Sequence, residues 1–359
     1  MIVWYCLLLH LFVQSTDSLY STPPAVVTAP EPLFRFGLIG DIQYCADIDN
    51  APAFKGMRRY IQSLGIYKEA IDYWNELTRK SSSEVCAICL GDQLDGKTAT
   101  LLRQTECLAD FLNVAKSFNG SMHYCFGNHD HYTFERKDLY RHFIPAKYAH
   151  VCSPTKLYYD FEVYPGWRFI MLDSYEISTC GSTSTENKEA AIEILRRNNP
   201  GALKLGGNRF KGLPKEKYKY VPYNGGISET QLTWLRNILS KAQRDQEKVV
   251  VFCHQPIYSP LKPHSLIWNS EEVLDTLQSY GSTVQLYIAG HDHGGQYAVD
   301  ETGLHHLVPA APLECNVGEV SFGHCEVHED QFVLRWKGKI AGQDRKSALS
   351  WPSHMSFKS

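Results

Sequence analysis

Six short apolar runs, each followed at once by polar residues, constrain the fold more than any other feature of the sequence. They are rich in Val, Ile, Phe and Tyr, and most end beside a Gly. Runs of this length and composition are typical of buried strands. The six predicted strands span residues 34–39, 85–90, 123–126, 169–172, 249–253 and 284–289.

Helical patterns separate several of these runs. Apolar residues recur at helical spacing over 67–77 and 101–115, a further helix is predicted over 187–197, and Ser228 with Gln231 forms a capping box that opens another. Strands that alternate with helices predict an α/β fold, and open α/β sheets place their sites at the strand carboxyl ends.

Three segments fit the alternating pattern poorly. Residues 178–224 are rich in Gly, Asn, Lys and Ser and are interpreted as a cap or lid inserted into a domain that spans 34–342. More strands are expected after Gly294. Residues 343–359 are predicted to be a flexible tail, and the Pro-rich residues 19–33 an extended linker.

The first eighteen residues stand apart. Residues 2–13 are apolar apart from His10, and the run is too short to span a bilayer. It resembles a signal-peptide core, although no positive charge precedes it. The protein is therefore expected to be secreted if this leader is a signal peptide, and cytoplasmic if it is an ordinary apolar segment. No stable membrane span is expected.

Charge and cysteine content exclude some partners and sites. The chain has 36 basic and 39 acidic residues without a dense basic run, so no nucleic-acid partner is expected. Without Cys6 in the leader, ten of the eleven cysteines remain, an even number that is compatible with disulfides but does not indicate them. Cys86 and Cys89, three apart on a predicted strand, face opposite sides, which disfavours a redox pair or zinc knuckle.

Polar strand ends gather the residue types that bind metal ions. One Gly-Asp after a strand is usually a turn, but five such ends in one chain indicate a shared metal site. Those ends are Gly40-Asp41-Ile42-Gln43, Gly91-Asp92-Gln93-Leu94-Asp95, Gly127-Asn128-His129-Asp130, Cys253-His254 and Gly290-His291-Asp292-His293.

This ordered set resembles the calcineurin-like metallophosphoesterase superfamily, over nearly the whole chain from Phe34 onward. The resemblance implies a four-layer α/β (α+β) fold, in which two face-to-face mixed β-sheets are flanked by helices. Gln43 stands where most of the superfamily has His. With this Gln, five segments resemble the manganese-dependent ADP-ribose/CDP-alcohol diphosphatase family: residues 40–44, Arg58-Arg59, residues 172–175, residues 224–226 and residues 254–258. The leader, Cys45 and Asp130 depart from that family's pattern.

The resemblance also implies the ligands of two divalent ions that share Asp92. Such oxygen-rich sets suit Mn²⁺ or Mg²⁺ better than a zinc cage, so Mn²⁺ is favoured, while Mg²⁺ and Zn²⁺ remain possible. A hydroxide bridging the two ions is the expected nucleophile. One ion is assigned to Asp41, Gln43, Asp92 and His293, and the other to Asp92, Asn128, His254 and His291.

Other residues receive roles beside the metals. His129 is assigned to transition-state stabilisation or to protonation of the leaving oxygen, with Asp95 or Asp130 orienting it. The remaining assignments are substrate contacts, each with an alternative. They are Arg58 and Arg59 (phosphate contact or solvated helix start), Asn224, Gly225 and Gly226 (backbone N–H groups for phosphate or a plain loop), and Tyr44 and Tyr258 (base stacking or core packing).

The leading hypothesis is a hydrolase that splits ADP-ribose, CDP-choline or related small nucleotide diphosphates into two monophosphates, acting as a monomer. A phosphodiesterase or phosphomonoesterase of the same superfamily is the alternative, of the cyclic-nucleotide or sphingomyelin type. A non-catalytic scaffold is disfavoured, because all seven ligand positions and His129 are present.

Overall fold

The computed structural model describes residues 31–53, 56–80, 85–204, 208–260, 262–338 and 355–356. The predicted leader and all of the predicted linker before Glu31 lie outside these ranges, as does most of the predicted tail. The described part of the chain is built around two six-stranded mixed sheets. All six predicted strands are present, as β1, β4, β5, β7, β10 and β11.

The first sheet joins strands from both ends of the chain. β1 pairs in parallel with β4, and antiparallel with β14, so Phe36 lies opposite both Cys86 and Cys325. Because β1, β4 and β5 are parallel, their carboxyl ends meet at one edge. In spatial order its strands are β16 (Met355–Ser356), β15 (Gln331–Gly338), β14 (Ser321–Val327), β1 (Phe34–Ile39), β4 (Val85–Cys89) and β5 (Ser121–Tyr124).

The second sheet comes from the middle of the chain. β10 pairs in parallel with both β7 and β11, which again brings strand carboxyl ends together. In spatial order its strands are β12 (Gln296–Val299), β13 (His305–Val308), β11 (Val284–Ile288), β10 (Lys248–Phe252), β7 (Trp167–Met171) and β6 (Tyr159–Tyr164).

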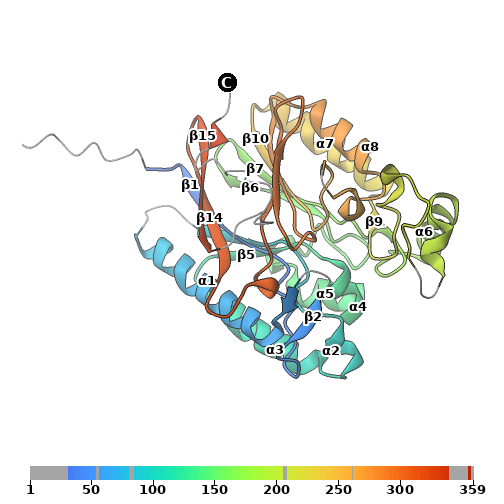
Figure 1. Cartoon of the computed structure of the whole chain (residues 1–359). Helices are drawn as coiled ribbons and strands as arrows, with labels where there is room; N and C mark the ends of the chain where they lie inside the picture. The colour runs from blue at the N-terminus through green and yellow to red at the C-terminus, as the bar shows by residue number, and fades with distance from the viewer. Residues whose placement is uncertain are drawn as a thin grey trace, which may run out of the picture. The chain divides into compact units, whose positions relative to one another are not determined.

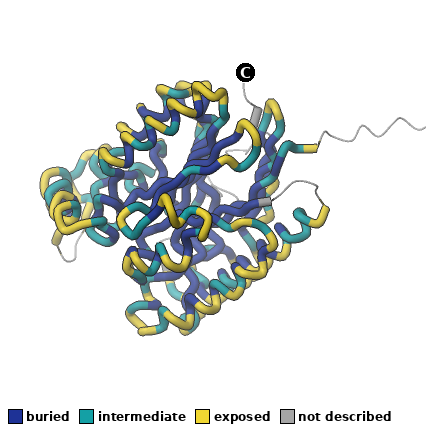
Figure 2. Tube along the Cα trace, turned by 180° about the vertical axis from the view of Figure 1, so that it is seen from behind, coloured by how far each residue is buried: buried dark blue, intermediate teal, exposed yellow. Residues whose placement is uncertain are grey.

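The two sheets pack face to face through apolar side chains. The ring of Phe36 on β1 lies 5.0 Å from that of Phe169 on β7 and 5.8 Å from that of Phe252 on β10. Edge-to-face contacts of this kind add to the free energy gained by burying the rings. The tube in Figure 2 shows the buried strands at the centre, with the exposed residues on the outer helices and loops.

Helices cover the outer face of each sheet (Figure 1). On the first sheet, α1 (Tyr60–Lys80) places the Trp74 indole over Gly37, and its Nε1 donates to the Gly323 carbonyl. On the second, α7 (Glu229–Arg244) and α8 (Ser270–Gln278) bury Leu235 and Val273 against the sheet. The four-layer architecture expected from the sequence is therefore confirmed.

Two helix predictions need correction. The helix expected over 101–115 is α3 (Gln104–Ala115), which begins three residues later because Leu102 has a φ of 57°, and a short helix, α2 (Lys97–Thr100), precedes it. Ser228 caps α7 by accepting from the Gln231 N–H, but the Gln231 side chain does not return to Ser228. It binds the backbone of Asp173 instead, so only half of the capping box forms.

The predicted cap is attached to the domain by a short two-stranded sheet, β8 (Ile177–Ser178) and β9 (Gly225–Gly226). Between them, α6 (Thr185–Asn198) begins at Ser184, whose hydroxyl accepts from the Asn187 N–H. The prediction that this segment acts as a lid stays a prediction. The remaining elements are β2 (Ala51–Ala53), β3 (Gly56–Arg58), α4 (Asn128–Thr133) and α5 (Arg136–Phe143).

Three further predictions meet the structure here. Met355 and Ser356 form β16 beside β15, so this part of the expected flexible tail lies in a sheet. None of the ten cysteines that the structure describes forms a disulfide. Among the described residues, no helix is both long and apolar enough to cross a bilayer.

Candidate metal centre

The candidate ligands lie at the carboxyl ends of five strands, where the two sheets meet. The first sheet contributes the residues that follow β1, β4 and β5, and the second sheet those that follow β10 and β11. They are Asp41, Gln43, Asp92 and Asn128 from the first sheet and His254, His291 and His293 from the second. The structure thus brings all seven together.

Backbone strain is concentrated at these positions. Six non-glycine residues of the described chain have positive φ, and four of them are candidate ligands. Left-handed backbone is unfavourable for residues with a side chain, and such strain collects at functional sites. The four are Asp41 (54°), Gln43 (46°), Asp92 (54°) and His291 (69°).

Hydrogen bonds between the ligand loops hold this arrangement. The Gln43 N–H donates to the Asp92 carbonyl at 2.8 Å, which ties the loop after β1 to the loop after β4. The Asp41 carboxylate accepts from the His291 N–H at 2.9 Å, which ties the two sheets together. Gly290 leaves room for that contact, since a Cβ there would lie 2.6 Å from the Asp41 Oδ2 atom.

Two groups of side chains have the spacing of metal ligands. Their possible ligand atoms lie within 4.8 Å of one another in each group, and Asp92 belongs to both. One group is Asp41, Asp92 and His293, and the other is Asp92, His254 and His291. This division matches the assignment made from the sequence, with Gln43 and Asn128 as the additional predicted ligands.

The imidazole tautomers show that a cation fits between His254 and His291. The His254 Nδ1 atom lies 2.8 Å from the Leu90 carbonyl, which only accepts, so Nδ1 carries the proton and Nε2 a lone pair. The His291 Nε2 atom lies 2.8 Å from the Asn224 Oδ1 atom, so Nδ1 carries the lone pair there. These two lone pairs face each other at 3.2 Å. Without a proton to share, a metal ion is what makes their approach favourable.

The same reasoning applies to the other group. The His293 Nδ1 atom lies 2.8 Å from the Glu314 carboxylate, so its Nε2 atom carries the lone pair. The Gln43 Nε2 atom lies 2.9 Å from that Nε2 atom and donates to Asp92 Oδ2 at 3.1 Å, while the buried Gln43 Oε1 atom has no hydrogen-bond partner among the described residues. A buried oxygen without a donor is costly unless a cation binds it. The residues therefore fit two divalent ions.

Electrostatics point the same way. Burial raises the pKa of Asp41 well above its usual value, and the charge of Asp92 raises it further. Burial lowers the pKa of His291 well below its usual value, and the neighbouring His254 adds to this. Without a cation, this buried site thus disfavours the charged carboxylates of Asp41 and Asp92 side by side, and it also disfavours a protonated His291. Divalent cations between neutral imidazoles and carboxylates relieve both costs.

His129 lies beside the candidate ligands without belonging to either group. Its Nδ1 atom is 3.0 Å from Asp95 Oδ2, and its N–H donates to Asp92 Oδ1 at 2.8 Å. Burial lowers the pKa of His129, but the Asp92 and Asp95 carboxylates outweigh burial, so this pKa lies above its usual value. The Asp95 carboxylate is therefore the charged group beside the His129 Nδ1 atom, to which the Gly96 N–H also donates at 3.1 Å.

Asp130 has another role than the one expected. Its carboxylate accepts from the backbone N–H groups of Asp92 (2.8 Å), Gln93 (2.9 Å) and Gly127 (2.8 Å). These bonds fix the loop after β4 to the start of α4. Asp130 thus shapes the backbone that carries Asp92, and the prediction that it orients His129 is wrong.

Most predicted substrate contacts are engaged in the fold instead. Tyr44 is buried, and its hydroxyl donates to Asp110 at 2.8 Å, so it packs in the core. Arg59 donates to the Cys315 carbonyl at 3.0 Å. The Gly225 N–H donates to the Gln255 side chain at 3.1 Å, so it is unavailable to a phosphate. Each of these three groups therefore has a partner within the fold.

Arg58 and Tyr258 keep open the roles predicted for them. Arg58 Nε lies 3.6 Å from Glu314 Oε1, close to the candidate metal ligand His293. Tyr258 is half-buried and packs on the His306 ring at 4.9 Å. Of these two residues, only Arg58 is linked to a candidate ligand, His293, through their shared contact with Glu314.

Three side-chain contacts to candidate ligands were not predicted: those of Glu314, of Asn224, and of Tyr175, whose hydroxyl donates to Asn128 Oδ1 at 3.3 Å. Glu314 follows no strand and matches no motif, so nothing in the sequence marks it as the partner of His293. Asn224 was assigned for its backbone, whereas its side chain is what contacts His291. Long-range pairs of this kind, 21 and 67 residues apart, become visible only in the fold.

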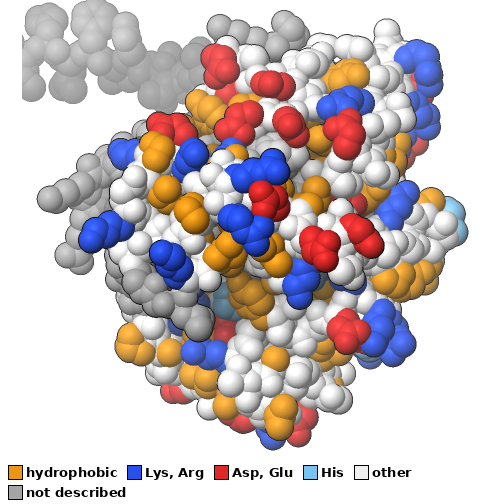
Figure 3. Space-filling model, turned by 90° about the vertical axis from the view of Figure 1, so that its right-hand side faces the viewer, with side chains coloured by type: hydrophobic (Ala, Val, Ile, Leu, Met, Phe, Trp, Pro, Cys, Tyr) orange, Lys and Arg blue, Asp and Glu red, His pale blue; other side chains and the backbone are white. Residues whose placement is uncertain are grey.

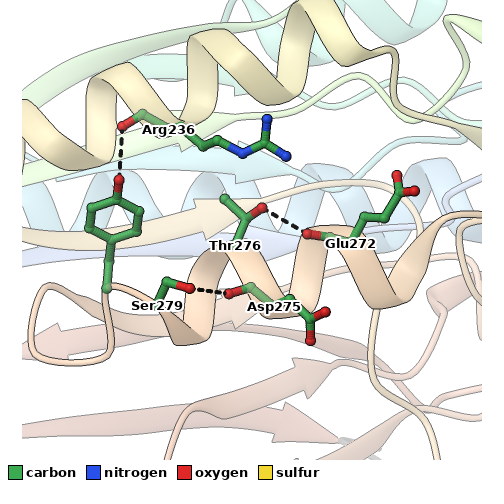
Figure 4. A pocket seen from close by; sticks show the side chains of 6 residues that line it. Arg236, Glu272, Asp275, Thr276 and Ser279 are labelled. Carbon is green, nitrogen blue, oxygen red and sulfur yellow. Dashed lines mark hydrogen bonds between the residues drawn. The ribbon is translucent and has the colours of Figure 1, made fainter.

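One surface hollow lies away from the candidate metal ligands, between α7 and α8. Figure 4 shows this hollow of about 350 Å³, where Thr276 and Ser279 direct their hydroxyls to the carbonyls of Glu272 and Asp275. The Thr276 and Ser279 hydroxyls are thus already hydrogen-bonded to the backbone of α8.

On the face shown in Figure 3, acidic and basic side chains of the described residues are interspersed, without a continuous basic surface.

Comparisons with known proteins agree with this geometry. The model of the calcineurin-like phosphoesterase family matches residues 34–295. A manganese-dependent ADP-ribose/CDP-alcohol diphosphatase of Arabidopsis thaliana is 35% identical over 324 residues, which cover 88% of this chain and 98% of that protein. The protein of the same name from Homo sapiens is 32% identical over 331 residues, covering 89% and 94%. The crystal structure of a dimetal phosphatase from Danio rerio superposes with a TM-score of 0.76 at 28% identity, covering 87% of this chain and 98% of that one.

Proposed function

The chain belongs to the calcineurin-like phosphoesterase family, and we propose that it is a manganese-dependent hydrolase of ADP-ribose, CDP-alcohols and related nucleotide diphosphates. The observation that carries the proposal is the pair of ligand groups that share Asp92. Relatives named for this activity, with 32–35% identity over most of the chain, support the substrate class.

The donor set supports manganese. Asp41, Asp92 and Asn128 offer oxygen atoms, and Gln43 has a buried oxygen without a donor. Sites rich in oxygen with a few imidazoles suit Mn²⁺, whereas thiolate ligands, which favour zinc, are absent from both groups. When bound, the two ions activate water for attack on phosphorus and stabilise the charge on the phosphate oxygens.

The residues around the ions position the reacting groups. His129, beside Asp95 and with a raised pKa, holds a proton next to the place where the leaving oxygen develops charge. Arg58 is held near His293 through Glu314, where a guanidinium can pair with the second phosphate. Buried Asp130 keeps the Asp92 loop rigid, so the shared ligand needs no rearrangement.

Hydrolysis needs no reactant other than water. The oxygen of water forms a bond to one phosphorus atom, the bond from that phosphorus to the bridging oxygen breaks, and the protons of water pass to the products or to solvent. The bridging oxygen leaves with the other phosphate, which has a second pKa of about 6 and so departs readily as an anion. The products are AMP and ribose phosphate from ADP-ribose, or CMP and a phosphorylated alcohol from a CDP-alcohol.

Product analysis tests the proposal. The purified protein with Mn²⁺ would be incubated with ADP-ribose, CDP-choline and bis(p-nitrophenyl) phosphate. We expect AMP and CMP from the first two. Asp92→Asn should abolish both products, whereas Asp275→Asn on the exposed side of α8 should not. Cleavage of the simple diester alone would contradict the proposed substrate class.

A further inference from the structure

The side chain of Asn224 is completely buried and bonds on both sides of its amide. Its Nδ2 atom donates to the carbonyl oxygens of Lys219 (2.8 Å), His264 (2.8 Å) and Leu266 (3.1 Å). Its Oδ1 atom lies 2.8 Å from the Nε2 atom of His291. Asn224 therefore connects the end of the predicted cap and the loop after β10 with a candidate metal ligand.

These contacts fix the chemistry of the pair. Three carbonyl oxygens surround one end of the Asn224 amide, and carbonyls only accept, so that end must be the NH₂ group. The other end is then the oxygen, which also only accepts. The His291 Nε2 atom must carry the proton that is donated to it. The His291 Nδ1 atom keeps its lone pair, and it faces His254.

We propose that Asn224 is a positioning residue, which holds His291 in the tautomer and ring orientation that present Nδ1 to the second metal ion. The inference rests on the two-metal site of the proposed function but not on its substrate. A partner of this kind on the far nitrogen of a ligand imidazole typically changes metal affinity by about 10- to 100-fold.

Asn224 should affect only one of the two ions. His293, in the other ligand group, has the Glu314 carboxylate as its partner, and a carboxylate raises the basicity of the imidazole. His291 and His254 have neutral partners, the Asn224 amide and the Leu90 carbonyl. The ion held by Asp92, Asn128, His254 and His291 is therefore the more weakly bound, and the one sensitive to Asn224.

Asn199 offers a matched control in the same segment. It too is buried, donates to a backbone carbonyl (Tyr220, 2.9 Å) and accepts from a backbone N–H (Ala202, 3.2 Å). Neither of these bonds involves a candidate metal ligand. Asn199→Ala therefore removes loop hydrogen bonds as Asn224→Ala does, but leaves the His291 imidazole with its partner.

The test measures metal binding without substrate. Free Mn²⁺ would be followed by its EPR signal during titration of the wild type, Asn224→Ala and Asn199→Ala. We expect two bound ions in the wild type and in Asn199→Ala. In Asn224→Ala the first ion should bind as in the wild type, and the second about 10- to 100-fold more weakly.

The outcomes separate this inference from the proposed function. Fewer than two ions bound by the wild type would contradict the two-metal site itself. Two ions bound equally well by Asn224→Ala, or equal weakening in Asn199→Ala, would contradict only the role of Asn224.

A second measurement on the metal-free wild type guards against misfolded variants. Long-range ¹⁵N–¹H NMR should show His291 protonated on Nε2, with its signal identified by its loss in His291→Asn. Protonation on Nδ1 would overturn the inference.

Discussion

The Oε1 atom of Glu314 lies 2.8 Å from the Nδ1 atom of His293 and 3.6 Å from the Nε atom of Arg58. The Glu314 carboxylate thus orients the candidate metal ligand His293 and also lies beside the Arg58 guanidinium. Since Glu314 lies in a short turn after β13 and precedes Cys315, which bonds Arg59, the segment joins the metal centre to the start of α1.

Glu314→Gln should weaken binding of the ion assigned to Asp41, Gln43, Asp92 and His293. The amide can still accept from His293, but it no longer raises the basicity of the ring, so we expect about a tenfold loss of Mn²⁺ affinity. The dependence of activity on Mn²⁺ concentration measures it. Glu319→Gln, in the exposed turn that follows, should leave that dependence unchanged.

His129→Ala should discriminate between leaving groups. A phosphate leaves as a stable anion, whereas a phenolate, with a pKa of about 10, needs a proton. We expect kcat/KM to fall by about 10²- to 10⁴-fold more for a phenyl phosphodiester than for ADP-ribose. Asp95→Asn should show the same preference in weaker form. Equal losses on both substrates would remove His129 from the role of proton donor.

Gly127→Ala should disrupt the shared ligand. A Cβ at this position would overlap with the Asp92 carboxylate and the His254 ring, both of which belong to the metal site. Overpacking of this kind costs about 1–3 kcal/mol, so we expect a lower melting temperature together with loss of bound Mn²⁺. Gly201→Ala is the control, because its Cβ would meet only Asn199 Oδ1, at 3.5 Å. Retention of both ions in Gly127→Ala would contradict the close packing of Gly127 against Asp92 and His254.

Stability should decrease as the pH falls below about 6.5. His123 is completely buried against Phe161, and burial lowers its pKa from 6.5 to about 3. Between these values the unfolded chain takes up a proton that the folded chain does not, so the free energy of unfolding falls by about 1.4 kcal/mol per pH unit for this group. Urea denaturation from pH 7 to 5 would show a shallower pH dependence in His123→Phe. The exposed His142→Phe variant should keep the slope of the wild type.

Much of the fold follows from the sequence because the buried strands and their polar ends are local patterns. The strand runs and the Ser228 cap depend on neighbours within a few residues, and they are confirmed. The predicted start of α3 is three residues too early, because the exposed apolar residues Leu101 and Leu102 extend the helical pattern although the backbone at Leu102 is left-handed.

The site was predictable where a ligand follows a strand, and less so where a side chain reaches it from elsewhere. Tyr44, next to Gln43, is a predicted substrate contact, but its ring is buried and its hydroxyl donates to Asp110 on α3. Gln231 likewise matched a helix-capping pattern, yet it binds the backbone of Asp173 across the fold.

Each ligand group contains side chains from both sheets, so an ion bound there would cross-link the two sheets. The sheets otherwise adhere through apolar packing, which is non-directional and tolerates small sliding movements. A metal cross-link at the strand ends would add a directional restraint, and the two sheets would then unfold together. The free energy of unfolding of the whole domain would then increase with manganese concentration, through mass action on the folded state.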